Sequence, residues 1–247
     1  MPDVRALMAG RKRVAIVPAL NEEGSVGSVI DEIRAFDPGF AIVVVDDGSS
    51  DRTAQVARAH GASVVRLPFN LGIGGAVQTG YRYAFERGFE LAVQIDGDGQ
   101  HDPAELPRIL EPVLDGRVDM AVGSRFAGER AYRPPLARRL GIRLFAGIVS
   151  LLVRQRVTDT TSGFRAVNRR GIALFAADYP HDYPEVEATV MVVKHRLRLC
   201  EVSVSMRERT AGRSSIGALS SVYYMVKVML ALFVGVFRRR ALPSEEA

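Results

Sequence analysis

The stretch LAVQIDGDGQHDP, residues 91–103, decides how the rest of the chain is organised. Its first five residues are an apolar run of the kind that forms a buried strand. The run leads into a glycine-containing loop that carries Asp96, Asp98 and Asp102. Open α/β sheets bind ligands at the carboxyl ends of their strands, and this loop is predicted to lie at such an end.

Asp96 and Asp98 stand one residue apart. At neutral pH their carboxylates would repel each other unless a cation lies between them. A divalent metal ion is the simplest such cation, because carboxylate oxygens are ligands that Mg²⁺ prefers. We expect Gly97 and Gly99 to make the loop flexible beside a bulky ligand.

The composition of the 247 residues, 47% hydrophobic and 25% charged, is that of a globular protein. The net charge of +5 is modest and the basic residues form no run interleaved with aromatic ones, so nucleic acid is not an expected partner. Residues 1–13 lack the apolar segment of a secretory signal, which predicts synthesis in the cytoplasm. The single cysteine, Cys200, is predicted to be a packed thiol.

Strand and helix patterns alternate along the first half of the chain, as in βαβ units. They predict an α/β fold whose mainly parallel central sheet carries helices on both faces. A later stretch, 136–153, is arginine-rich and amphipathic, and 200–206 alternates like a strand. The predicted strands of the first half are 13–18, 41–45, 63–67, 91–95 and 119–123, and the predicted helices are 26–33, 53–60 and 75–87.

Acidic and amide residues follow three of these strands. Because parallel strands end at one edge of the sheet, these side chains are expected to gather there. They would offer hydrogen-bond acceptors to a ribose and a base, beside a metal for a diphosphate. The residues are Asn21, Glu22, Asp46, Asp47, Asp96 and Asp98.

Two other motifs are incomplete. The glycines of residues 72–75 suggest a dinucleotide loop, but Val77 stands at the third glycine position and the loop follows the third strand instead of the first. The acidic loop resembles the start of an EF-hand, but its twelfth position is Pro107 instead of glutamate.

Several motifs, in order, resemble family 2 glycosyltransferases of the GT-A fold, and most of all the polyprenyl-phosphate sugar synthases typified by dolichyl-phosphate mannose synthase. The resemblance spans nearly all of residues 13–215. Its motifs are VPALNE at 17–22, VVDDGSSDRT at 44–53, NLGIGGAVQTG at 70–80, IDGDGQHDP at 95–103, VGSRF at 122–126, DTTSGFRAVNR at 159–169 and RTAGRSS at 209–215.

The resemblance implies how a nucleotide-sugar donor would be held. Asp96, Asp98 and Gln100 would hold Mg²⁺ or Mn²⁺ against the diphosphate of a UDP- or GDP-linked sugar, and Arg209 would reach the same diphosphate. With the strand-end residues Asn21 and Asp46, the implied donor site comprises Pro18, Leu20, Glu22, Asp47, Asp96 and Gln100.

The resemblance also implies an acceptor site. Arg125, with Arg138 or Arg139, would grip the phosphate of a polyprenyl phosphate, because a guanidinium fits a phosphate with two parallel hydrogen bonds. Asp98, Arg125 and Arg209 are therefore the expected catalytic residues. Two positions depart from the family pattern: Ser215 stands where lysine is usual, and Ile142 stands about where a serine is expected.

The acceptor decides the mechanism. A phosphate monoester is already largely ionised near neutral pH, since its second pKa is about 6, so an inverting in-line displacement needs no strong base. A sugar or glycolipid hydroxyl would need a carboxylate base, for which Asp159, Glu185 and Glu187 are the candidates. A third hypothesis is a non-catalytic nucleotide-sugar-binding module of a membrane complex.

The C-terminal segment suggests the membrane. Residues 222–237 are apolar apart from one lysine, and three arginines follow at 238–240. The segment is shorter than the roughly 20 residues of a membrane span, so we expect a helix at the membrane interface, with packing on the sheet or in a homodimer as alternatives. A small membrane protein is a further expected partner.

These patterns predict a tail (1–12), a catalytic domain (13–215), an amphipathic helix (216–240) and a second tail (241–247). The predicted location is cytoplasmic, with peripheral attachment to the cell membrane.

Overall fold

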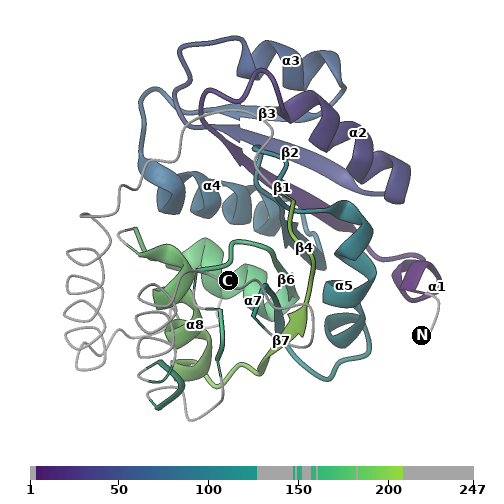
Figure 1. Cartoon of the computed structure of the whole chain (residues 1–247), viewed down its shortest axis with the longest axis vertical. Helices are drawn as coiled ribbons and strands as arrows, with labels where there is room; N and C mark the ends of the chain where they lie inside the picture. Colours follow the sequence, from purple (N-terminus) through teal and green to yellow (C-terminus); the bar gives the residue numbers. More distant parts are fainter. Residues whose placement is uncertain are drawn as a thin grey trace. The chain divides into compact units, whose positions relative to one another are not determined.

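A seven-stranded sheet forms the centre of the fold (Figure 1). The computed structural model describes residues 4–126, 147, 149–151, 157–159, 161–181 and 183–207. The strand order is β3-β2-β1-β4-β6-β5-β7, and only β6 runs against its neighbours. The strands are β1 Arg13–Ala19, β2 Ala41–Asp46, β3 Ser63–Arg66, β4 Leu91–Gln94, β5 Met120–Ser124, β6 Arg165–Asn168 and β7 Leu199–Ser203.

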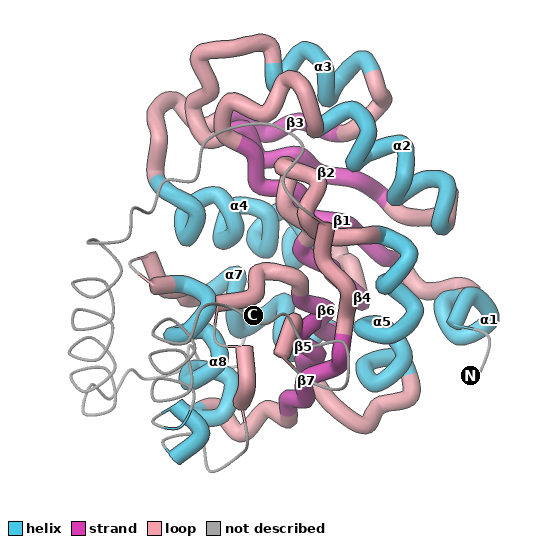
Figure 2. Tube along the Cα trace, in the orientation of Figure 1, coloured by secondary structure: helices cyan, strands magenta, loops and turns pink. Residues whose placement is uncertain are grey.

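Helices cover both faces of this sheet (Figure 2). Helices α2, α3 and α5 pack on one face, whereas α4, α7 and α8 pack on the other. Their bounds, with those of the short α1 and the 3₁₀ turn η1, are α1 Val4–Met8, α2 Val26–Phe36, α3 Thr53–Ala59, α4 Gly72–Glu86, η1 Pro103–Glu105, α5 Leu106–Leu114, α7 Arg169–Ala177 and α8 Pro184–Lys194.

The alternation of side chains along β1 explains why both faces are covered. Val14 and Ile16 point into the core under α4, α7 and α8, while Ala15 and Val17 point into the core under α2 and α5. Successive side chains of a strand point to opposite faces, so a continuous apolar run supplies both cores. All four side chains are fully buried.

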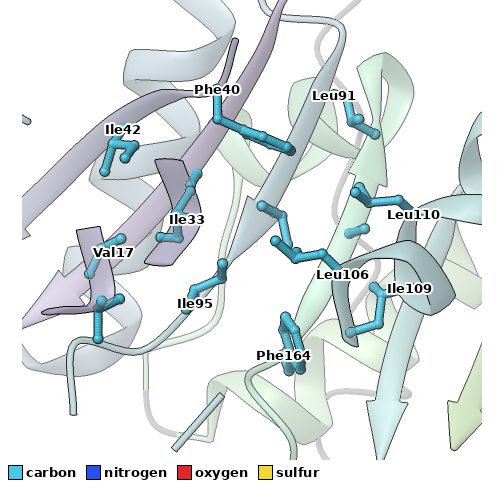
Figure 3. Close-up of a cluster of buried hydrophobic side chains, with 14 of the residues drawn as sticks. Val17, Ile33, Phe40, Ile42, Leu91, Ile95, Leu106, Ile109, Leu110 and Phe164 are labelled. Carbon is cyan, nitrogen blue, oxygen red and sulfur yellow. The ribbon is translucent and has the colours of Figure 1, made fainter. Parts of the chain in front are cut away.

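The core under α2 and α5 reaches the carboxyl end of β4 (Figure 3). Ile33 of α2 and Leu106 of α5 lie in this core with Ile95, the residue directly before the acidic loop. Ile95 and Phe164 are fully buried there. The loop therefore begins from a fixed apolar anchor.

The predicted mainly parallel α/β sheet with helices on both faces is confirmed, and the five strands predicted in the first half of the chain end within one residue of their predicted bounds. The helix predicted at 75–87 begins earlier, at Gly72, so its glycines form the first turn instead of preceding the helix. The partly buried Cys200 packs against the core under α2 and α5, and burial raises the pKa of its thiol.

The sequence patterns missed β6 and four helices, α1, α5, α7 and α8, of which α1 lies in the predicted tail 1–12. Strand β6 is four residues long and contains the buried Arg165, so it lacks the apolar run of a buried strand. Helices α5 and α8 have proline in their first turn, and α5 also contains Pro112. Proline in a helix interior normally argues against a helix.

Candidate active site

Three strand ends are joined by main-chain hydrogen bonds at one edge of the sheet. The amide of Gly97 donates to the carbonyl of Pro18 over 3.2 Å, and the amide of Asp47 donates to the carbonyl of Ala19 over 2.9 Å. The loops after β1, β2 and β4 therefore meet at this edge, as their parallel order predicts.

Asp96 is held from several sides. Its amide donates to Nδ1 of His101 over 3.0 Å, its Oδ1 accepts from Nε2 of Gln94 over 3.3 Å, and its Oδ2 lies 3.6 Å from Nε2 of His101. A side chain at Gly163 would lie 2.9 Å from Gln94 Nε2 and 3.3 Å from both carboxylate oxygens of Asp96. The missing side chain at Gly163 therefore leaves room for this carboxylate.

The loop then turns back on itself. Asp98 is buried, and its Oδ1 accepts a hydrogen bond of 3.0 Å from the amide of Gln100. Gly99, between them, has a φ of 77°, which favours glycine. The carbonyl of Gln100 accepts from the amide of Arg207 over 2.9 Å, so the chain that follows β7 is paired with this loop.

The donor set fits a divalent metal that is completed by its substrate. No group of three or more His, Cys, Asp or Glu able to hold a metal occurs within the described ranges. Asp96, Asp98 and Gln100 supply two carboxylates and an amide on one loop. Mg²⁺ is usually bound by one or two carboxylates, with substrate phosphates and water as its other ligands. These three residues would therefore hold the ion only as part of a donor complex.

The loops after β1 and β2 are fastened to each other through Asn21. Its amide donates to Ser49 Oγ over 2.9 Å, and its side-chain oxygen accepts from the amide of Ser50 over 2.9 Å. Its φ of 55° is in the left-handed region, which asparagine tolerates better than most residues. The fully buried Asp46 accepts from the amide of Ser49 over 2.9 Å. Both side chains shape this turn, and their contact with a donor stays a prediction.

Asp47 is a buried carboxyl at the same edge. It accepts a hydrogen bond of 2.7 Å from the amide of Leu71, just before α4. Burial raises the pKa of Asp47, the neighbouring Asp46 raises it further, and the amides of Leu71 and Gly72 oppose the rise. The net effect is a pKa above the ordinary value of 3.8.

The remaining predicted donor residues lie at the same place. Pro18 is buried, Glu22 is partly buried, and Leu20 is exposed. The amide of Glu22 donates to Thr53 Oγ1 over 2.8 Å, and its carboxylate accepts from Ser25 Oγ over 2.8 Å. The structure thus brings together all the predicted donor residues that follow β1, β2 and β4.

Arg125 lies at the end of β5 in an ion pair. Its Nε and Nη2 donate to the two oxygens of Asp159 over 2.8 and 3.0 Å, and Nη2 also donates to Thr161 Oγ1 over 2.7 Å. Burial alone would raise the pKa of Asp159, but the hydrogen bonds and charge of Arg125 hold it below its ordinary value. Glu201 supports the pair by accepting from the amide of Asp159 over 2.9 Å. A carboxyl held ionised in this way is a poor general base.

A buried polar layer, which the sequence patterns did not indicate, lies beneath Asp96. Arg165 is 1% exposed and donates to the carbonyls of Ser162 and Glu185, but its Nη1 has no hydrogen-bond partner among the described residues. Burial raises the pKa of Glu185, Arg165 opposes that rise, and Asp96 adds to it. Of the candidate bases Asp159 and Glu185, only Glu185 therefore has a pKa shifted toward neutrality.

Other predicted residues lie outside the described ranges: Arg138, Arg139, Arg209, Ile142, Ser215 and the helix predicted at 216–240. Their predicted roles, and the predicted domain bounds, stay predictions. Within the described residues, no helix is both long and apolar enough to cross a membrane.

Comparison with known proteins decides the family. The model of glycosyl transferase family 2 matches residues 14–174, which include the acidic loop, Arg125 and Arg165. The chain belongs to this family. It is a glycosyltransferase similar to polyprenyl-phosphate sugar synthases.

Two curated relatives illustrate the likeness. An uncharacterized protein of Methanocaldococcus jannaschii is 36% identical over 76% of this chain and 79% of its own length. The undecaprenyl-phosphate mannosyltransferase of Micrococcus luteus is 30% identical over 82% of this chain and 86% of its own length.

The fold is also similar to a solved structure, that of glucosyl-3-phosphoglycerate synthase from Mycobacterium tuberculosis in complex with Mn²⁺, UDP and glucosyl-3-phosphoglycerate. The match has a TM-score of 0.73 at 23% identity and covers 96% of this chain and 84% of the other. This likeness supports the GT-A fold.

Replacing Arg125 with alanine should destabilise the protein as well as alter its site. The change leaves the buried carboxylate of Asp159 without its cation. Breaking a buried ion pair in this way costs about 3–5 kcal/mol, and we expect the low end because the Arg125 side chain is 32% exposed. Urea unfolding of Arg125→Ala, Asp159→Asn and the double variant measures this cost. The double variant should be more stable than Arg125→Ala, and strictly additive losses would contradict the structural role of the pair.

Asp47→Asn should raise the free energy of unfolding at neutral pH. Asparagine keeps an oxygen for the Leu71 amide and removes a buried charge. Because the folded pKa of Asp47 is raised, the penalty of its charge is full above that pKa and disappears as the pH falls toward the unfolded value, about 3.9. Urea unfolding from pH 7 to pH 4 measures the gain, and a gain that is independent of pH would contradict the explanation.

Proposed function

We propose that this glycosyltransferase moves a sugar from a UDP- or GDP-linked donor to a polyprenyl phosphate at the cytoplasmic face of a membrane, with inversion at the anomeric carbon. One observation supports donor binding: Asp47, Asp96 and Asp98 lie together at one edge of the sheet. The acceptor half is supported by relatives named as an undecaprenyl-phosphate mannosyltransferase and a polyprenol monophosphomannose synthase.

The residues of the chain would divide the work of donor binding. Pro18, Leu20, Glu22 and Asp47 would receive the base and ribose, with Asn21 and Asp46 holding the loop between them. Asp96, Asp98 and Gln100 would hold Mg²⁺ or Mn²⁺. A protein of similar fold, glucosyl-3-phosphoglycerate synthase, has been solved in complex with Mn²⁺ and UDP. When bound, such an ion supplies positive charge that stabilises a departing diphosphate.

The acceptor needs positioning more than activation. A phosphate oxygen that is already ionised attacks without giving up a proton, so the protein has only to align it with the anomeric carbon. Arg125, at the end of β5, would bind that phosphate together with Arg138 or Arg139, and Arg209 would bind the donor diphosphate. A surface helix at 216–240 would keep the enzyme at its lipid substrate.

A hydroxyl acceptor is the second candidate, and Glu185 is the observation that favours it. Its raised pKa suits a general base, and it lies near enough to Asp96 for the two charges to interact. Glucosyl-3-phosphoglycerate synthase, which shares the fold, has a structure with UDP-glucose and phosphoglyceric acid.

Transfer assays with extracted polyprenyl phosphate, soluble sugar acceptors and a panel of UDP- and GDP-sugars test the proposal. We expect turnover with the lipid phosphate, and turnover with soluble acceptors alone would contradict it. Glu185→Gln separates the two mechanisms, because loss of a general base typically lowers kcat about 10²–10⁴-fold, whereas an ionised phosphate needs no base. A kcat with lipid phosphate that survives Glu185→Gln is the expected result.

Asp98→Asn tests the metal. The amide oxygen can still accept the Gln100 hydrogen bond that shapes the loop, but the charge is lost. Calorimetry with UDP and with GDP, with and without Mn²⁺, should show wild-type affinity rising with the metal and variant affinity remaining at the metal-free level. Asp31→Asn, in the exposed pair with His60, is the control. Equal metal dependence in Asp98→Asn and wild type would refute the assigned role.

A further inference from the structure

Both ring nitrogens of His101 lie close to Asp96. Nδ1 lies 3.0 Å from the backbone nitrogen of Asp96, and Nε2 lies 3.6 Å from its carboxylate Oδ2. His101 is 4% exposed. One side chain thus contacts the main chain and the carboxylate of the same residue.

These contacts determine the tautomer of His101. A backbone N–H can only donate, so Nδ1 must accept, and in a neutral imidazole the proton then lies on Nε2. Nε2 lies 3.6 Å from Oδ2 of Asp96, which is longer than a hydrogen bond, while Nε2 of Gln94 donates to Oδ1 over 3.3 Å. A polar side chain therefore lies beside each oxygen of the carboxylate, and the hydrogen bond from the Asp96 amide is the contact that ties His101 to this residue.

The imidazole is itself held in place. Its ring stacks on Phe164 with centroids 4.8 Å apart and planes 10° from parallel, and Phe164 is fully buried. The main chain of His101 also pairs with Met206 in an antiparallel bridge. Because the ring of His101 is held against the core, its hydrogen bond also limits the movement of Asp96.

We propose that His101 is a positioning residue that fixes Asp96 for metal-dependent binding of the donor diphosphate. This inference rests on the proposed function, in which Asp96 is a metal ligand. Groups that hydrogen-bond to metal ligands fix their orientation, and replacing such groups typically costs 10–100-fold in metal affinity. Positioning by His101 also explains why a histidine occupies an interior place next to an acidic loop.

Three substitutions separate the contacts of His101. In His101→Asn, the side-chain oxygen can take the place of Nδ1 and keep the bond to the Asp96 amide. In His101→Gln, the amide nitrogen can take the place of Nε2 and keep the contact with the carboxylate. His101→Phe preserves stacking on Phe164 but removes both polar contacts.

Calorimetry measures the binding of UDP and of GDP by each variant, with and without Mn²⁺, beside thermal unfolding. His101→Phe should lose about 10–100-fold in affinity with Mn²⁺ and little without it, and the two amide variants should lie between it and wild type. His60→Asn is the matched control, because His60 also contacts an aspartate, Asp31, on the exposed surface.

The outcomes are distinguishable. If wild type gains no affinity from Mn²⁺, the metal part of the proposed function falls, and this inference falls with it. If wild type gains affinity and His101→Phe gains as much, the inference alone is overturned. Equal losses with and without Mn²⁺ overturn it too, because they indicate general disruption of the site.

The imidazole nitrogen spectrum gives a readout that is independent of binding. The chain has four histidines, and His101→Asn identifies the signals of His101 in a protein with ¹⁵N-labelled histidine. We expect the proton on Nε2 and none on Nδ1. A proton on Nδ1 would overturn the inference, because Nδ1 could not then accept from the Asp96 amide.

Discussion

The hydrogen bond from the Gly97 amide to the Pro18 carbonyl joins the acidic loop to the end of β1, and the site depends on this contact. A side chain at Gly97 would lie 3.1 Å from Ala19 Cβ and 3.2 Å from the Pro18 carbonyl oxygen. Close approach, and not the flexibility that the sequence suggests, is therefore the reason for glycine here. With β2 held to Ala19 on the other side, the carboxyl groups of three loops share one edge.

Gathering carboxylates at a buried edge is costly, since burial and mutual repulsion both disfavour their charged forms. The structure balances the cost differently at each one. Asp46 and Asp98 accept backbone amides, Asp47 keeps a raised pKa, and Asp96 accepts a hydrogen bond from Gln94 with His101 close by. Backbone amides orient oxygens of Asp46 and Asp98, and Gln94 orients one of Asp96, whereas Oδ2 of Asp46 lies 3.3 Å from Nε of Arg66 in an ion pair. Carboxylates gathered at one edge in this way would attract a cation that arrives with an anionic substrate.

The sequence predicts this edge well because two strong regularities define it. Apolar runs mark the parallel strands, and the residues after each run must meet at one edge. It predicts supporting residues poorly, because their importance comes from contacts across the sheet. Arg165 looks like one more polar residue until β6 pairs it with Gln94. His101 lies within a quoted motif, yet only the folded loop brings its ring against Asp96. The pairing of Arg125 with Asp159 likewise joins segments 34 residues apart.

That last pairing constrains any role of Arg125 at the acceptor. A phosphate that took Nε and Nη2 would displace Asp159, whose buried carboxylate would then lose the cation that keeps its pKa low. A phosphate that binds Arg125 without displacing Asp159 would leave the guanidinium oriented by that carboxylate. Retention costs less, because it leaves no buried charge unpaired. An Arg125 oriented by Asp159 would thus present a fixed edge to the acceptor, much as an Asp96 oriented by His101 presents fixed oxygens to the donor.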